Sequence, residues 1–213
     1  MFNKKYTKLV AAMGITMFAG VAQAANTFDI ADNGGFETGD TSGWTVFGGG
    51  GVSTVNPSSG LYSGQGTCIG GPCDVLFKNA NKGIGVAQAG GSITINFDYR
   101  GTQADGGVIF AELFSELDGG GVSKTELLFG GPLFGAGDVW QTASITTTLG
   151  ADVLGGVTLQ LKSSCGAAAT CVSDAYFDNV QMLVEPVPVP AAVWLFGSGL
   201  LGLVGVARRK KAA

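Results

Sequence analysis

Histidine is absent from the 213 residues of this chain, and charged residues make up only 13% of it. Without histidine the chain lacks the commonest general base, so the Ser-His-Asp and Cys-His arrangements of nucleophilic catalysis are excluded. Two carboxylates can still hydrolyse a glycoside. Neither Glu112 with Glu116 nor Asp98 with Asp105 stands out among sixteen acidic residues. We therefore expect a protein that is not an enzyme, with a glycoside hydrolase as the least favoured alternative.

Positive charge is scarce between the two ends of the chain. Residues 25–185 contain five lysines and arginines and all sixteen carboxylates, which gives this segment a net charge of −11. Such a surface repels nucleic acid phosphates and anionic lipid, so we expect no nucleic acid partner. Calcium or a neutral glycan is a more plausible partner, although a high net charge also serves solubility.

The N-terminus has the three parts of a secretory signal peptide. Lys4, Lys5 and Lys8 form a basic region, residues 9–21 are apolar, and residues 22–24 read Ala-Gln-Ala, a small-x-small cleavage site. We predict a signal peptide over residues 1–24 and a mature chain that begins at Ala25. The protein is therefore expected to be exported.

The C-terminus, residues 186–213, has the composition of a membrane anchor. Residues 191–207 contain no charge, and a stretch of this length can cross a hydrocarbon core of about 30 Å as a transmembrane helix. A basic cluster follows at once, and cations beside an apolar span are retained on the cytoplasmic side. The members of this cluster are Arg208, Arg209, Lys210 and Lys211.

A proline signature precedes the apolar span and reads Val187-Pro188-Val189-Pro190-Ala191. Signature, span and basic end together resemble the PEP-CTERM sorting signal of Gram-negative bacteria, with Val189 in place of the commoner glutamate. The resemblance implies recognition and cleavage by an exosortase-type membrane enzyme, in a bacterium that makes extracellular polysaccharide. It implies a protein held transiently at the membrane and then located at the cell surface or outside the cell. A plain membrane anchor is the alternative.

Cysteine is limited to four residues in two local pairs. In an oxidising compartment an even count at short spacings indicates disulfides, for which three pairings exist. We favour Cys68 with Cys73 and Cys165 with Cys171. A zinc site is the alternative, but four-thiolate sites usually have two-residue spacings.

Short apolar runs separated by paired glycines leave little room for helices between residues 25 and 185. Residues 92–99 and 156–162 alternate apolar and polar side chains, as half-buried strands do. Residues 108–117 fit a helix as well, but their glycine flanks favour a strand. Many short strands without intervening helices predict one all-β domain, a β-sandwich, over residues 25–185.

Three segments, residues 33–44, 139–148 and 175–184, narrow the architecture. In this order they resemble the first, a late and the final strand of the galactose-binding-like jelly rolls found in many carbohydrate-binding modules. The resemblance implies a jelly-roll β-sandwich whose first and last strands are neighbours. It also implies a structural calcium ion between Glu37 and Asp178, which oxygen ligands of this kind can hold. A capping role for Glu37 and a turn role for Asp178 is the alternative.

Glycan binding requires exposed aromatic faces, and five aromatic residues are candidates: Trp44, Tyr62, Tyr99, Trp140 and Tyr176. Trp44 and Trp140 occupy motif positions that usually fill the core, and Tyr99 shares its strand face with three apolar residues. Tyr62 is the favoured ligand contact.

The chain is thus expected to be an exported, non-enzymatic protein of the cell surface or extracellular matrix, with an N-terminal signal peptide and a C-terminal transmembrane helix flanking a jelly roll. A carbohydrate-binding module that recognises extracellular polysaccharide is the alternative.

Overall fold

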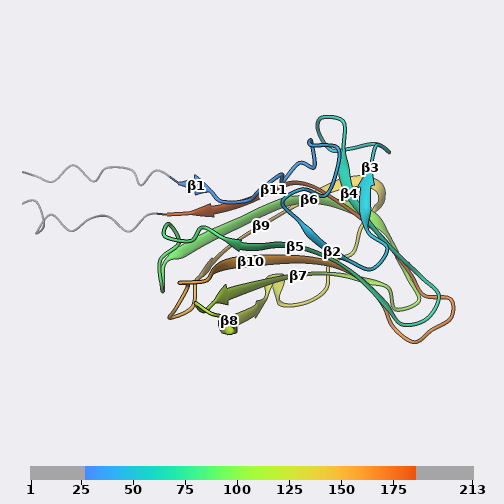
Figure 1. Ribbon diagram of the computed structural model, residues 1–213. Coiled ribbons are helices and arrows are strands. Elements are labelled where there is room, and N and C mark those ends of the chain that lie inside the picture. Colours follow the sequence, from blue (N-terminus) through green and yellow to red (C-terminus); the bar gives the residue numbers. More distant parts are fainter. Residues whose placement is uncertain (1–26, 186–213) are drawn as a thin grey trace, which may run out of the picture. The chain divides into compact units, whose positions relative to one another are not determined.

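The computed structural model describes residues 27–185, which fold into two antiparallel β-sheets packed face to face (Figure 1). No α-helix is present in this range, and a single 3-10 turn, η1, spans Leu128–Gly130. The strands in chain order are β1 Phe28–Asp29, β2 Thr45–Phe47, β3 Gly51–Ser53, β4 Ser63–Ile69, β5 Cys73–Lys82, β6 Ser92–Ala104, β7 Val108–Glu116, β8 Val122–Leu127, β9 Gly137–Thr148, β10 Gly156–Cys165 and β11 Val172–Val184.

One sheet has the strand order β3-β4-β11-β6-β9, with β1 also paired to β11, and the other has the order β2-β5-β10-β7-β8. The first and last strands, β1 and β11, are neighbours, with Phe28 opposite Val184. The expectation that residues 33–44 contain the first strand is wrong, because this segment forms turns between β1 and β2. The expected all-β sandwich is confirmed.

The core lies between the sheets and follows the alternation read from the sequence. Ile93, Ile95, Phe97 and Tyr99 of β6 all face inward and are buried. Residues 108–116 form strand β7, which settles the helix-or-strand ambiguity. Because strands place successive side chains on opposite faces, the polar residues between the β6 core positions lie on the outer face of the sheet.

Strand β10 differs from the expected half-buried strand. Val157, Leu159 and Leu161 face the core, but Thr158 and Gln160 are buried as well. The reason is the central position of β10 between β5 and β7. The Thr158 hydroxyl accepts the backbone N–H of Asn81 in β5, and the Gln160 amide donates to the Glu112 carboxylate in β7.

Five aromatic rings pack against one another in the core. Phe36 stacks on Trp44 with ring centroids 5.2 Å apart, and Phe77 meets both Phe36 and Phe177 edge to face. Phe97 meets Phe177 in the same way. Such edge-to-face and stacked pairs add to the stability that area burial supplies.

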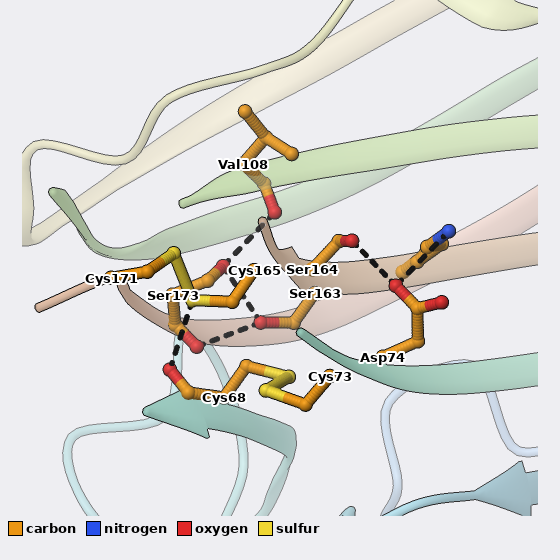
Figure 2. The surroundings of a disulfide bond; sticks show 10 residues. Cys68, Cys73, Asp74, Val108, Ser163, Ser164, Cys165, Cys171 and Ser173 are labelled. Atoms are coloured by element: carbon orange, nitrogen blue, oxygen red, sulfur yellow. Dashed lines mark hydrogen bonds and ion pairs between the residues drawn. A yellow bond between two sulfur atoms is a disulfide. The ribbon is translucent and has the colours of Figure 1, made fainter. Parts of the chain in front are cut away.

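Two disulfides join Cys68 to Cys73 and Cys165 to Cys171, the pairing favoured by the short spacings (Figure 2). The first joins β4 to the start of β5, and the second joins the end of β10 to the residue directly before β11, so each links the two sheets. They lie side by side, with Cys165 Sγ 3.6 Å from the Cys68 carbonyl oxygen.

Buried hydroxyls link the sheets at the same end of the sandwich. Ser163 Oγ of β10 donates to the Ser173 carbonyl of β11, and Ser173 Oγ donates to the Val108 carbonyl of β7 (Figure 2). Covalent and hydrogen-bonded links therefore tie the two sheets together beside the disulfides.

The described range contains no helix that is long and apolar enough to cross a membrane. The predicted signal peptide at 1–24, the sorting motif at 187–191 and the basic cluster at 208–211 lie outside the described residues.

Candidate functional site

The outer face of the six-stranded sheet carries a row of side chains from three neighbouring strands. Gln65 of β4 lies opposite Tyr176 of β11, and Tyr176 lies opposite Arg100 of β6. All three occupy positions that alternate with core residues, so their side chains leave the sheet on the side away from the core. Residues distant in the sequence are thereby aligned across the sheet.

Arg100 is at the β6 end of this row and is only 2% exposed. Its guanidinium carbon lies 3.6 Å from the ring centroid of Tyr176 and 5.2 Å from that of Trp140. Nη1 donates to an Asp138 carboxylate oxygen at 3.1 Å and Nη2 to the Val55 carbonyl at 2.6 Å. Nε has no hydrogen-bond partner. The two aromatic rings and two acceptors offset the cost of removing the cation from water.

A hydrogen-bonded polar group continues from Tyr176 toward β4. Gln65 Nε2 donates to the Tyr176 hydroxyl at 2.7 Å and to Asp174 Oδ1 at 3.1 Å, and Thr67 Oγ1 donates to Asp174 Oδ1 at 2.7 Å. Burial and the negative charge of Asp174 raise the pKa of Tyr176 above its ordinary value. Since the ordinary pKa of tyrosine is already 10.0, the phenol keeps its proton at neutral pH and can serve as a donor.

A hollow of about 190 Å³ adjoins this polar group at the edge of the sheet. Gln65 and Thr67 line it on one side, and residues 49–52 line it on the other. Three of the four residues in that segment are glycines, which leave the hollow free of bulky side chains. The amide of Gln65 and the hydroxyl of Thr67 are therefore within reach of a ligand in the hollow. We call Gln65, Thr67, Arg100, Trp140, Asp174 and Tyr176 the outer-face cluster.

The predicted calcium ligands, Glu37 and Asp178, converge on the loop that precedes β4. Glu37 Oε1 accepts the backbone N–H groups of Leu61 and Tyr62, each at 3.0 Å. Asp178 Oδ2 accepts those of Ser58 and Ser59 at 2.9 and 3.0 Å. The two carboxylates thus hold one short loop from both sides.

These contacts do not match a calcium site as they stand. Calcium requires six to eight oxygen ligands, whereas amide hydrogens point at both carboxylates. Within residues 27–185 no group of three or more acidic, histidine or cysteine residues is placed to hold a metal. Loop anchoring is the role that the structure shows, and calcium between Glu37 and Asp178 stays a prediction. A melting temperature that falls in EDTA and recovers in excess calcium would support it, and an unchanged one would contradict it.

Asp98 lies opposite Asp178 in the sheet. The pKa values of the two carboxyls are shifted in opposite directions from their ordinary value. Burial, together with the charge of Asp98, raises the pKa of Asp178 against the effect of its backbone hydrogen bonds. Burial also acts on Asp98, but hydrogen bonds from Asn179, Ser58 and Thr142 outweigh it and lower the pKa of Asp98. Asp178 is fully buried and Asp98 is half-buried, so a substrate cannot reach the carboxyl of Asp178.

The five aromatic candidates divide into three groups. Trp44 and Tyr99 are buried in the core, as expected. Tyr62, the favoured contact, is half-buried against the core, and its ring lies 3.3 Å from where a Cβ would stand at Gly39. Trp140, expected in the core, is instead half-buried beside Arg100, and Tyr176 lies on the other side of the guanidinium.

Sequence reasoning missed Arg100, Gln65, Thr67 and Asp174. The outward position of Arg100 could have been predicted, because it continues the alternating polar series of Thr94, Asn96 and Asp98. The other three depend on which strands are neighbours, and no local pattern reports that.

No family model and no curated protein matches the chain. Solved structures do match: TmCBM61 in complex with beta-1,4-galactotriose has a TM-score of 0.51 at 18% identity, over 74% of this chain and 99% of its own. The CBM22-1 xylan-binding domain of Xyn10C from Paenibacillus barcinonensis has a TM-score of 0.55 at 15% identity, over 78% and 99%. The cyclase Fisc from Fischerella sp. TAU has a TM-score of 0.53 at 18% identity, over 76% and 100%. Identities this low show a shared fold alone, the jelly roll of carbohydrate-binding modules.

Proposed function

We propose that residues 27–185 form a carbohydrate-binding module that holds an extracellular glycan on the outer face of the six-stranded sheet. The outer-face cluster carries this proposal, because it combines a partly exposed indole with polar groups next to a hollow. Sugars present an apolar face of C–H groups and a rim of hydroxyls. The Trp140 ring can pack against the C–H face of a sugar, and the polar groups of Gln65, Thr67 and Asp174 can form hydrogen bonds with its hydroxyls.

Charge narrows the class of glycan. The one cation of the cluster, Arg100, is already paired with Asp138, and Asp174 adds a carboxylate. The whole segment 25–185 has a net charge of −11. A polyanionic polysaccharide is therefore disfavoured, and a neutral one is the expected ligand.

The wider role follows from the two ends of the chain. The protein is exported, sorted by residues 186–213 through an exosortase-type enzyme and non-enzymatic, and it acts at the cell surface or in the extracellular matrix. The two disulfides support this proposal, since such bonds persist in oxidising compartments. A generic glycosidase assay on the purified protein should detect no hydrolysis.

Trp140→Ala tests the binding face directly. We expect this change to weaken binding to the producer's own polysaccharide, or to a soluble neutral β-glycan, by about tenfold, which corresponds to ~1.4 kcal/mol. Isothermal titration calorimetry measures the affinity, and circular dichroism confirms that the variant is folded. Phe47→Ala is the matched control, because Phe47 is an exposed aromatic residue on β2 of the other sheet.

Two outcomes would contradict the proposed site. Absence of binding by the unaltered protein to any glycan at millimolar concentration rejects the module altogether. If Tyr62→Ala loses glycan binding and Trp140→Ala retains it, the binding site is instead in the loop before β4, as predicted from the sequence.

A further inference from the structure

Two loops at one end of the sandwich are almost free of charge. Residues 83–91 join β5 to β6, residues 149–155 join β9 to β10, and Asp152 is their single charged residue. Backbone hydrogen bonds hold the loops together, from Leu149 N to Gly91 O at 2.8 Å and from Gly90 N to Gly150 O at 2.9 Å. The two loops therefore form one continuous tip, which we call the apolar tip.

Large aliphatic side chains of the apolar tip face outward. Leu154 is 68% exposed and Ile84 is 62% exposed, and Val86 is exposed as well. A hollow of about 420 Å³ lies between the loops and is lined mainly by small and apolar residues. Asp152 also lines it, but Oδ1 of Asp152 accepts the N–H of Leu154 and so belongs to the loop's own structure.

The apolar tip lies at the end of the sandwich where the described chain ends. Val184, the last residue of β11, pairs with Ile93, and β6 begins directly after the first loop. On the other side, a Cβ at Gly83 would meet Ile30 Cδ1 at 2.7 Å, and Ile30 follows β1. Figure 1 shows β1, the end of β11 and both loops at the same end of the domain.

Chain length connects this end to the predicted membrane span. Residues 186–190 separate Glu185 from the span at 191–207, and five residues reach at most about 18 Å. A tail in the bilayer therefore leaves Glu185, and the apolar tip beside the end of β11, within reach of the membrane surface. The disulfides lie at the other end of β11, which spans 13 residues at about 3.3 Å per residue.

We propose that Ile84, Val86 and Leu154 insert into the interfacial layer of the lipid bilayer that holds the tail. Exposed aliphatic groups on a nearly uncharged tip gain from leaving water at this depth. A net charge of −11 favours zwitterionic over anionic lipid. The inference rests on the anchoring part of the proposed function and is independent of glycan binding. It assigns the apolar tip to the stage at which the protein is still tethered.

Leu154→Trp and Ile69→Trp make a matched pair for the test. Ile69 is 67% exposed and lies opposite Val172 at the disulfide end of β11. Residues 25–213 carrying either change are reconstituted in phosphatidylcholine vesicles that contain brominated lipid. The native tryptophans contribute the same background to both variants. We expect additional quenching of the Leu154→Trp fluorescence, by about a third or more of the added signal, and none for Ile69→Trp.

Co-sedimentation with the vesicles distinguishes failure of the predicted membrane anchor from failure of the apolar tip to insert. Protein that stays in the supernatant overturns both the predicted anchor and this inference. Protein that sediments, with equal quenching of the two variants, leaves the anchor standing and overturns the insertion of the apolar tip. Neither result bears on binding of a glycan by the outer-face cluster.

Discussion

At the scale of single residues, Arg100 contributes both to the stability of the fold and to the candidate site. Its side chain is removed from water on the face of the sheet away from the core, a position where a strand normally presents solvated polar groups. Two aromatic rings, a carboxylate and a backbone carbonyl surround the guanidinium. A planar cation that stacks and donates through a fork fits this space, whereas a lysine ammonium does not.

Arg100→Ala should therefore destabilise the domain by about 2–4 kcal/mol, because it leaves Trp140 and Tyr176 without the group packed between them. Arg100→Lys should recover only part of this loss. Urea unfolding followed by fluorescence measures both. Lys162→Ala removes a cation from a more exposed ion pair with Asp74 and should cost less than about 1 kcal/mol. Equal losses at positions 100 and 162 would contradict the buried role of Arg100.

Carboxyl groups set the response of stability to acid. The pKa values of Asp40, Asp74, Asp98 and Glu126 are lowered from ordinary values of 3.8 or 4.5 by their hydrogen bonds. Each such group stabilises the fold above its ordinary pKa and loses this contribution as the pH falls. Burial raises the pKa of Asp178, so this group acts in the opposite direction and favours the fold as the pH falls.

Melting temperatures between pH 6 and pH 3 test this balance. We expect the unaltered protein to lose stability on acidification, and Asp178→Asn to lose it more steeply, since the opposing contribution of Asp178 is gone. The comparison is of slopes, so any constant effect of the substitution cancels. A shallower slope in the variant would show that the pKa of Asp178 is not raised.

At the scale of elements, a shift in the register of β6 sets the direction of the Arg100 side chain. The register between β6 and β9 shifts between Tyr99 and Gly101, and such bulges bend a strand and redirect its side chains. Gly101 has φ +136, which other residues rarely adopt, and a Cβ there would lie 1.9 Å from the Asp174 carbonyl oxygen. Only glycine fits this position.

Gly101→Ala should thus cost about 2–4 kcal/mol of stability and weaken glycan binding with it. Gly51→Ala in β3 is the control, because a Cβ at Gly51 meets nothing within 4 Å and should leave the melting temperature almost unchanged. Thermal unfolding by circular dichroism distinguishes the two. A Gly101→Ala domain as stable as the control would mean that the backbone at the bulge can move aside.

Elements also show the limits of local patterns. The alternation in residues 92–99 predicted the inner face of β6 correctly, because the period of a strand is two. Strands β1, β2 and β3 have only two or three residues each, and a pattern that short carries no period. Long strands were therefore predictable, and the short edge strands were not.

At the scale of the whole molecule, the two sheets are joined covalently at one end and the chain leaves at the other. The disulfides join strands of opposite sheets, and the apolar tip lies beside the end of β11. This polarity agrees with the proposed tether at one end of the domain and the proposed glycan site on a side of the sandwich.

Intact-mass spectrometry of the exported protein tests the predicted processing. We expect a chain that begins at Ala25 and lacks the basic cluster at 208–211, because both predicted signals are cleaved during export and sorting. A variant with Pro188→Ala and Pro190→Ala should retain the basic cluster. A mature mass that includes residues 1–24, or an unaltered tail on the released protein, would contradict the respective prediction.

The sequence alone determined the features that depend on local spacing. It indicated the all-β class through glycine-separated apolar runs, the core face of β6 through its alternation, and the disulfide partners through separations of 5 and 6 residues. It also identified Glu37 and Asp178 as a pair, although their observed partners are backbone amides.

Only the tertiary structure decided the composition of the outer-face cluster. Gln65, Arg100 and Tyr176 form one row because β11 pairs with β4 on one side and with β6 on the other. Strand order and register are set by non-local pairing and by which faces can be buried together. The residues of a row share no local pattern, so the cluster emerges only when the sheet is assembled.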